Sequence, residues 1–213
     1  MSAWLAIAEA PEDDVLRQML ADELLARGDP LGELITLASR HAALGPTLEL
    51  PALERLRQLW KTHAPGLQAR FSAGDGRLSF SRGLQSRLRI DAAMWLYQPE
   101  VPAPIQRLEL DNVTEETLRA LLRRPLMQRL TSLVLRAPVE RPWSRLFFET
   151  LAEHLPPRLR HLGLVSILRP DRSEGVERLA DQLASLALGN VLLNWAALAH
   201  RPHPKLEELD LDL

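Results

Sequence analysis

One leucine pattern recurs five times along the second half of the chain, and it constrains the fold more than any other feature. The pattern is Leu-x-x-Leu-x-Leu, and it occurs as Ile105/Leu108/Leu110, Leu130/Leu133/Leu135, Leu159/Leu162/Leu164, Leu183/Leu186/Leu188 and Leu206/Leu209/Leu211. Successive triplets begin 25, 29, 24 and 23 residues apart. Self-similarity at such a period is typical of arrays in which each unit adds one strand to a continuous core. We therefore predict five short strands, with Leu88 and Ile90 as a degenerate earlier member.

The segments between the triplets carry the apolar spacing of helices. They are Glu115–Arg124, Ser144–Leu155 and Ser173–Leu183, and Thr114 is placed to cap the first of them. Strands that alternate with helices predict a parallel sheet with the helices outside it. The expected fold class is therefore α/β, a solenoid with a curved parallel sheet and helices on its convex side.

The composition agrees with repetition, because 46 of the 213 residues are leucine and only 5% are aromatic. The chain has no cysteine, which excludes disulfides, thiolate catalysis and cysteine-ligated zinc. A net charge of −2 argues against a general nucleic-acid binder. No long apolar run and no basic N-terminal region are present, so we expect a cytoplasmic protein without membrane insertion.

The chain before Gly66 has helical periodicity. We expect helices over Glu12–Arg27, Pro30–Ala43 and Pro51–His63, after a short helix over Ala3–Ala8. In the first corner, Gly28 suits the left-handed helix end, Asp29 suits the next N-cap, and Pro30 suits the first turn. The stripe expected to be buried on the helix before this corner consists of Val15, Leu16, Met19, Leu20, Leu24 and Leu25.

The periodicity changes after Gly66. The cluster Ser72–Gly76 contains an Asp-Gly pair, which is typical of a hairpin turn. Leu78 and Phe80 alternate with polar residues as in a strand, and Ser81-Arg82-Gly83 leads into the short strand at Leu88–Ile90.

The segment Ala21–Ile35 reads Ala-Asp-Glu-Leu-Leu-Ala-Arg-Gly-Asp-Pro-Leu-Gly-Glu-Leu-Ile and resembles the repeat-companion domain of planctomycete and myxobacterial proteins. Residues 84–213 resemble leucine-rich repeats of the α/β type, which often follow that domain. The resemblance implies a bacterial protein with a helical capping domain over residues 1–70 and five to six repeats over residues 71–213. It implies no activity. Where repeats of this type place Asn or Cys, this chain has Val113, Pro138, Ile167 and Val191.

Because side chains alternate along a strand, the residues between the buried leucines are expected on the concave face of the sheet. This row begins basic and mixed, becomes small and apolar, and ends acidic. Its candidate partner-binding residues are Arg87, Arg89, Arg107, Glu109, Asp111, Val134, Arg136, His161, Glu208, Asp210 and Asp212. The alternative is that these charges only solvate the face and pair across neighbours, with Arg107 beside Arg89 and Asp111 beside Asp91.

The final triplet lies in Lys205–Leu213, with no helix predicted after it. Its acidic residues Glu207, Glu208, Asp210 and Asp212 either keep a strand edge solvated or border an edge that another protein or a second copy pairs with.

The residues offer no catalytic, cofactor-binding or metal-binding motif, and His161 has no evident Ser or Asp partner in its triplet. The expected function is therefore a non-enzymatic protein–protein interaction module, or scaffold, that uses the concave face, the C-terminal edge or both. The alternative is a regulator of a small GTPase or an inhibitor of a partner enzyme. For a GTPase regulator, Asn112 and Asn190 are the asparagines at repeat edges.

Overall fold

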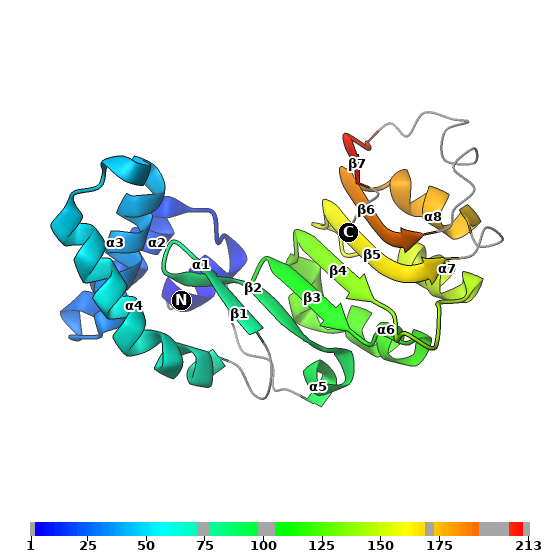
Figure 1. The fold of residues 1–213 in the computed structure, drawn as a ribbon, viewed down its shortest axis with the longest axis horizontal. Helices are drawn as coiled ribbons and strands as arrows, with labels where there is room; N and C mark the ends of the chain where they lie inside the picture. Colours follow the sequence, from blue (N-terminus) through cyan, green and yellow to red (C-terminus); the bar gives the residue numbers. More distant parts are fainter. Residues whose placement is uncertain (1–2, 72–76, 98–104, 169–172, 192–204, 211–213) are drawn as a thin grey trace. The chain divides into compact units, whose positions relative to one another are not determined.

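The structure is a computed structural model that describes residues 3–71, 77–97, 105–168, 173–191 and 205–210 (Figure 1). Its helices are α1 (Ala3–Glu9), α2 (Asp14–Ala26), α3 (Pro30–Leu44), α4 (Leu50–Phe71), α5 (Ala92–Tyr97), α6 (Glu115–Leu122), α7 (Arg145–Glu153) and α8 (Ser173–Ala180), with short 3-10 turns at Gly45–Thr47 and Pro125–Arg129. Its strands are β1 (Arg77–Ser81), β2 (Leu84–Asp91), β3 (Arg107–Asp111), β4 (Ser132–Arg136), β5 (His161–Leu168), β6 (Ser185–Val191) and β7 (Glu208–Asp210).

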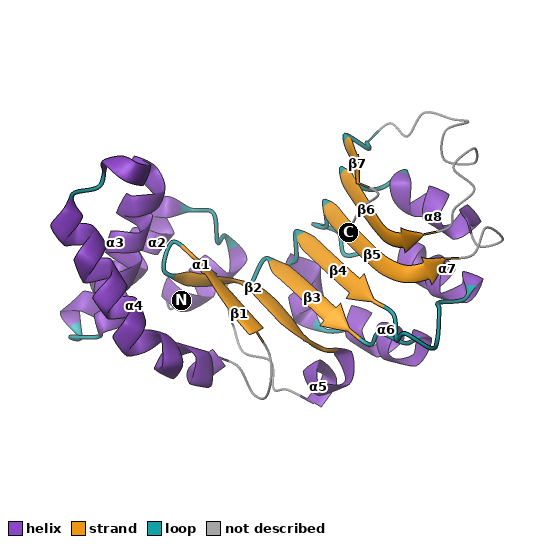
Figure 2. Cartoon of the chain, viewed as in Figure 1, coloured by secondary structure: helices purple, strands orange, loops and turns teal. Residues whose placement is uncertain are grey.

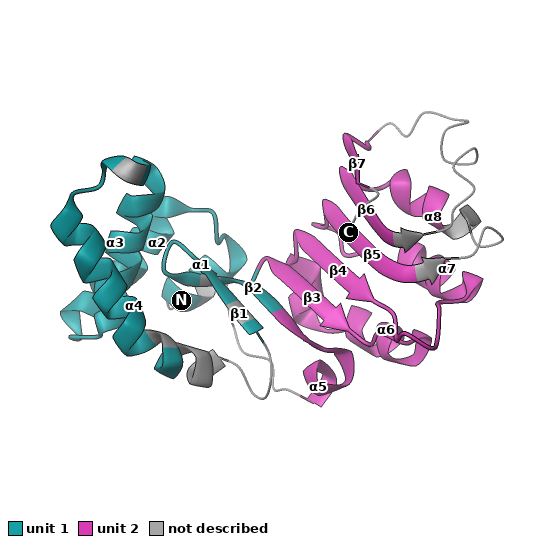
Figure 3. Cartoon of the chain, in the orientation of Figure 1, with its two compact units in different colours: residues 1–88, 99–105 teal, residues 89–98, 106–213 magenta. Residues whose placement is uncertain are grey.

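Contacts divide the chain into two compact units, shown in Figure 3. The first comprises Met1–Leu88 and Pro99–Ile105, and the second comprises Arg89–Gln98 and Gln106–Leu213. The domain boundary expected at residue 70 stays a prediction. No helix in the described ranges is both long and apolar enough to cross a membrane.

The predicted corner between α2 and α3 is confirmed. The Asp13 carboxylate accepts hydrogen bonds from the amides of Val15 and Leu16 at the start of α2, at 2.9 and 3.1 Å. Gly28 has φ +72°, a left-handed conformation that ends α2, and the Asp29 amide then donates to the Leu24 carbonyl at 2.9 Å. The Asp29 carboxylate caps α3 by accepting from the Leu31 amide at 2.9 Å.

The buried stripe predicted for α2 is wrong in part. Val15, Met19 and Leu25 are 69%, 56% and 46% exposed, whereas the buried residues of this helix are Arg17, Leu20, Ala21 and Leu24. The cause is a close approach of backbones: a Cβ on Gly32 of α3 would lie 2.6 Å from the Ala21 carbonyl oxygen. This contact turns the Ala21 side of α2 toward α3 and leaves Val15 and Met19 in solvent.

A hairpin of β1 and β2 completes the first unit. Its two-residue turn is Arg82-Gly83, with positive φ values of 48° and 80° as in turns that match the twist of a hairpin. The turn expected at Ser72–Gly76 lies outside the described residues. Gly83 packs on α3, because a Cβ there would lie 2.6 Å from the Cα of Ile35. Trp60 of α4 and Phe80 of β1 meet edge to face at 4.9 Å, so the hairpin shares the core of the helices.

The seven strands form one mixed, mostly parallel sheet in the order β1 to β7 (Figure 2). Because a two-residue turn joins them, β1 and β2 run antiparallel, whereas β3 to β7 are parallel to one another. The predicted triplet strands are confirmed, and their central leucines align across the sheet as Leu108, Leu133, Leu162, Leu186 and Leu209. The sheet is neither closed nor curled, and the curved solenoid stays a prediction.

Backbone hydrogen bonds repeat in step with the triplets. Just before each of the strands β3, β4, β5 and β6, one backbone carbonyl accepts two amides from the start of the following strand, at 2.8–3.1 Å. The four acceptors are the carbonyls of Gln106, Thr131, Arg160 and Ala184. The regular register of the leucines therefore has a backbone counterpart just ahead of the strands.

The core of the second unit lies between the strands and helices α6, α7 and α8, which lie on one side of the strands in Figure 2. Thr114 caps α6 as predicted, with reciprocal hydrogen bonds to Thr117. The burial expected of the last triplet is wrong for Leu209, which is 40% exposed, and Leu206 is only half-buried, while Leu211 lies outside the described residues. Strand β7 has three residues and is the last strand of the sheet.

Trp143 makes a buried hydrogen bond to the backbone that the sequence patterns do not predict. Its indole N–H donates to the Val113 carbonyl at 2.7 Å, in the turn between β3 and α6. The Val113 amide donates to the Arg136 carbonyl at 2.9 Å. Trp143 is 2% exposed and stacks on Phe147 at 4.2 Å. Trp143, which lies between β4 and α7, thus satisfies the Val113 carbonyl in the turn between β3 and α6.

Candidate functional site

The strand register places most of the predicted site residues on one face of the second unit. Three rows cross this face, which we call the open face, and their residues alternate with the buried leucines. The rows consist of Arg107, Ser132, His161, Ser185 and Glu208; of Glu109, Val134, Gly163, Ala187 and Asp210; and of Arg136, Val165 and Gly189. Arg89 and Asp111 border them on β2 and β3.

Exposure varies strongly across the open face. Arg107, His161, Glu208 and Asp210 are exposed. In contrast, Glu109 is 2% and Val134 9% exposed, so these two side chains lie on the open face but are buried there. Arg136, on the neighbouring strand β4, binds the buried Glu109.

Four charged residues of this face form one ion-pair network. Arg89 donates to both Asp111 carboxylate oxygens, from Nε at 2.8 Å and from Nη2 at 3.1 Å. Arg136 Nη1 lies 3.2 Å from Glu109 Oε2 and 3.7 Å from Asp111 Oδ1. The hydrogen bond to Asp111 raises the pKa of Arg89 above its ordinary value. The positive and negative groups therefore alternate across three strands and hold one another in place.

Charges on neighbouring strands thus do pair, as the alternative for this face predicts, whereas Arg107 beside Arg89 and Asp111 beside Asp91 stay predictions. The side chain of Asn112, a residue with φ +58°, donates to Asp91 at 2.8 Å. The other Asp91 oxygen accepts from the amides of Ala93 and Met94 at the start of α5, at 2.9 and 3.3 Å. The Arg136 guanidinium reaches diagonally to Glu109, which aligns with Val134 in the strand register. The short Asp91 carboxylate binds the backbone that follows it. Strand register alone predicts neither contact.

Arg107 differs from the other two arginines of the open face. Its Nε donates to Ser132 Oγ at 3.1 Å, and within the described ranges no carboxylate pairs with it. Ser132 is 6% and Ser185 9% exposed, and His161 between them is exposed. The structure thus places serines on both sides of His161, which has no Ser in its own triplet.

Of the other predicted site residues, Arg87 is half-buried in the part of β2 that belongs to the first unit, and Asp212 lies outside the described residues. The side chain of Asn190 is likewise not described.

Among the described residues, no group of three or more His, Cys, Asp or Glu side chains could hold a metal ion. A pocket of about 190 Å³ lies at the start of α6, lined by Thr114, Glu115, Glu116, Arg141, Pro142 and Trp143. Glu115 in this pocket accepts the Ser144 amide at 3.2 Å, which is a structural role.

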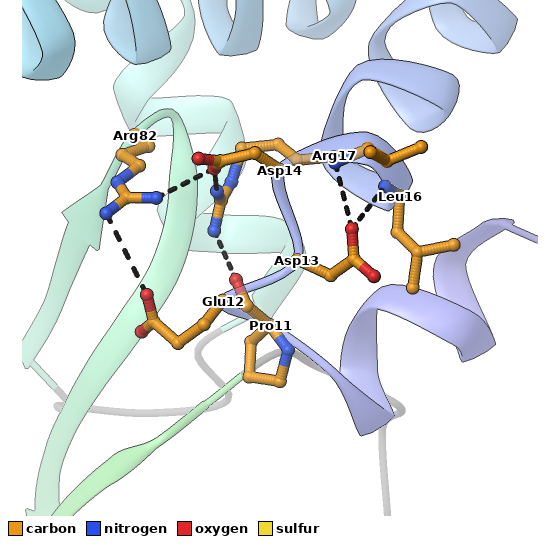
Figure 4. A network of polar contacts seen from close by, with 8 residues as sticks. Pro11, Glu12, Asp13, Asp14, Leu16, Arg17 and Arg82 are labelled. Atoms are coloured by element: carbon orange, nitrogen blue, oxygen red, sulfur yellow. Dashed lines mark hydrogen bonds and ion pairs between the residues drawn. The ribbon is translucent and has the colours of Figure 1, made fainter.

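A second polar network lies in the first unit, on a helix whose apolar spacing gives no sign of it in the sequence. Figure 4 shows Arg17 of α2, which is 5% exposed and donates to Asp14 and to the Pro11 carbonyl. Arg82 of the hairpin turn binds the same Asp14 at 2.7 Å and lies 3.8 Å from Glu12. Burial lowers the pKa of Arg17. The network fastens the hairpin turn to the start of α2.

Compared with known proteins, the chain matches no family model, no curated protein and no solved structure.

Proposed function

We propose that this chain is a bacterial, cytoplasmic, non-enzymatic protein–protein interaction module, a leucine-rich-repeat solenoid with a helical repeat-companion cap, and that it binds its partner through the open face. The observation that carries the proposal is the Arg89–Asp111–Arg136–Glu109 network. Its side chains already hold one another by hydrogen bonds and ion pairs, so a partner that meets them has less rotamer entropy to remove.

The rows beside this network support a protein partner. Val134, Gly163 and Ala187 succeed one another across β4, β5 and β6, so an area of small apolar residues adjoins the charged network. Such an area lets another backbone or side chain come close, while the flanking charges select orientation and partner. The cap is supported by the Gly28-Asp29-Pro30 corner and by the hairpin that packs on α3.

A second candidate is self-association through the edge strand β7. Its support is that Leu209 is 40% exposed, while the described backbone hydrogen bonds at this strand run toward β6. Regulation of a partner GTPase or inhibition of a partner enzyme would be a special case of binding at the open face. The Asn112 side chain gives no support to the first of these, because it binds Asp91.

Affinity capture with paired variants tests the proposal. Ala187→Glu places a carboxylate on the open face, and Ala120→Glu places the same group on exposed α6 as a control. We expect the partner retained by the wild-type chain to be lost with Ala187→Glu and kept with Ala120→Glu. Equal retention by the two folded variants contradicts use of the open face. Sedimentation of the wild-type chain and of Leu209→Asp tests the edge, since only edge pairing makes a dimer depend on Leu209.

A further inference from the structure

Four polar side chains stand in one row across β3, β4, β5 and β6. The strand pairing aligns Arg107 with Ser132, Ser132 with His161, and His161 with Ser185. We call these four residues the donor row. All stand on the open face, on the opposite side of the sheet from the buried leucines.

The donor row has hydrogen-bond donors left over. Because Ser132 Oγ accepts the Arg107 Nε–H, its own hydroxyl hydrogen is free to point elsewhere. The terminal nitrogens of Arg107 and the imidazole of His161 have no hydrogen-bond partner within the described ranges. The buried Ser132 hydroxyl thus lies between an exposed guanidinium and an exposed imidazole.

Within the described ranges, no carboxylate of the open face pairs with the Arg107 guanidinium. Glu109 is next to Arg107 on the same side of β3, but it is buried and binds Arg136 at 3.2 Å. Asp111 binds Arg89. Glu208 aligns with Ser185, at the far end of the donor row from Arg107. The end formed by Arg107, Ser132 and His161 is therefore the one that suits an anion.

We propose that Arg107, Ser132 and His161 bind a phosphate monoester carried by a side chain of the protein partner, an inference that rests on the proposed function. Adjacent strands are about 4.8 Å apart, so Arg107 and His161 are separated by about 10 Å at their Cα atoms. A phosphate above Ser132 accepts hydrogen bonds of about 2.8 Å from the side chains on both sides.

Phosphate fits this arrangement better than carboxylate does. The donors come from three strands, one on each side and one below, and phosphate presents three terminal oxygens in a tetrahedral arrangement. A carboxylate has two oxygens in one plane, which suits a single guanidinium, as Asp111 and Arg89 illustrate.

An NMR titration of the full chain tests the site. The probes are N-acetyl-phosphoserine amide, inorganic phosphate and N-acetyl-glutamate amide, and the readouts are the Ser132 amide and the His161 ring. We expect phosphoserine to shift both resonances saturably, with about tenfold weaker binding in Arg107→Gln and in His161→Gln. Arg119→Gln, on exposed α6, controls for the loss of a charge and is expected to bind as the wild-type chain does.

Three outcomes overturn the proposal: no saturable shift with phosphoserine, equal binding of the glutamate probe, or binding of inorganic phosphate alone. Partner capture separates this failure from failure of the proposed function. If Ala187→Glu abolishes capture while phosphoserine fails to bind, the open face binds protein but the phosphate site is wrong. If Ala187→Glu leaves capture unchanged, the proposed function itself fails.

Discussion

The Arg89 guanidinium and the Asp111 carboxylate form a two-point hydrogen bond, with Nε 2.8 Å from Oδ2 and Nη2 3.1 Å from Oδ1. Asp111 in turn faces Arg136, which binds the buried Glu109. A residue on β2 is thus connected to one on β4 through the Asp111 carboxylate of β3. The members of this network differ in burial, and that difference decides which substitutions should matter.

Removing Arg136 should cost more stability than removing Arg89. Glu109 is 2% exposed and loses its Arg136 partner in Arg136→Ala, at a cost of about 1.5–3 kcal/mol for a charged hydrogen bond. The Arg89 and Asp111 side chains are 42% and 29% exposed, so solvent screens the pair and Arg89→Ala should cost less than about 1 kcal/mol. Urea unfolding measures both, and the reverse order contradicts the network as described.

Gly83→Ala should destabilise the first unit strongly. The new Cβ would lie 2.6 Å from the Cα of Ile35 in a residue with φ +80°, so steric overlap adds to backbone strain. We expect a loss of about 2–4 kcal/mol in thermal or urea unfolding. Gly28→Ala is the matched control, because its φ is +72° but no atom lies within 4 Å of the new Cβ. Equal losses in the two variants would show that the contact with α3 contributes nothing.

Trp143→Phe should reveal the hydrogen bond to Val113. The substitution keeps an aromatic ring but leaves the Val113 carbonyl without its indole donor, at an expected cost of about 1–3 kcal/mol. Trp95→Phe provides the comparison, since the buried Trp95 N–H has no partner among the described residues. Unfolding of both variants should therefore show the larger loss at Trp143. A larger loss at Trp95 contradicts the assigned role.

The ion pair between α3 and α4 should make stability depend on pH. Arg55 donates to both Glu33 oxygens, at 2.8 and 2.6 Å, and these hydrogen bonds lower the pKa of Glu33. A carboxyl with a lowered folded-state pKa stabilises the protein above its unfolded-state pKa, and this stabilisation is lost as pH falls through the folded-state value.

Arg55→Gln should therefore be less stable than the wild-type chain at neutral pH, and the difference should vanish in acid. Carbon-13 titration of the Glu33 carboxyl should show its pKa returning toward the ordinary value in the variant. An unchanged pKa contradicts the assigned cause.

Local patterns predicted the elements well where the deciding atoms are close in sequence. Asp29 and Thr114 cap helices as expected, because a cap depends on amides only two or three residues away. The triplet strands and their common register follow from identical Leu spacing, because a slip of one residue would turn the leucines out of the core.

Contacts between distant segments were not predictable in this way. The burial of Arg17 and the exposure of Met19 depend on how closely Gly32 lets α3 approach Ala21. The burial of Glu109 depends on an arginine 27 residues away, and the link from Val113 to Trp143 spans 30 residues. Alternation along the strands predicts the residues of the open face but not their ion pairs. The Arg136 guanidinium, for example, binds Glu109 and not the residue directly opposite it alone.

By itself, the sequence determined the position of the strands, the helix caps and the row of residues that alternates with the leucines, since each follows from spacing along one segment. Only the tertiary structure decided which of those residues are already paired and which, like Arg107 and His161, keep donors to offer. The physical reason is that periodicity assigns a side chain to a face, whereas hydrogen bonding and burial depend on what folding brings beside it.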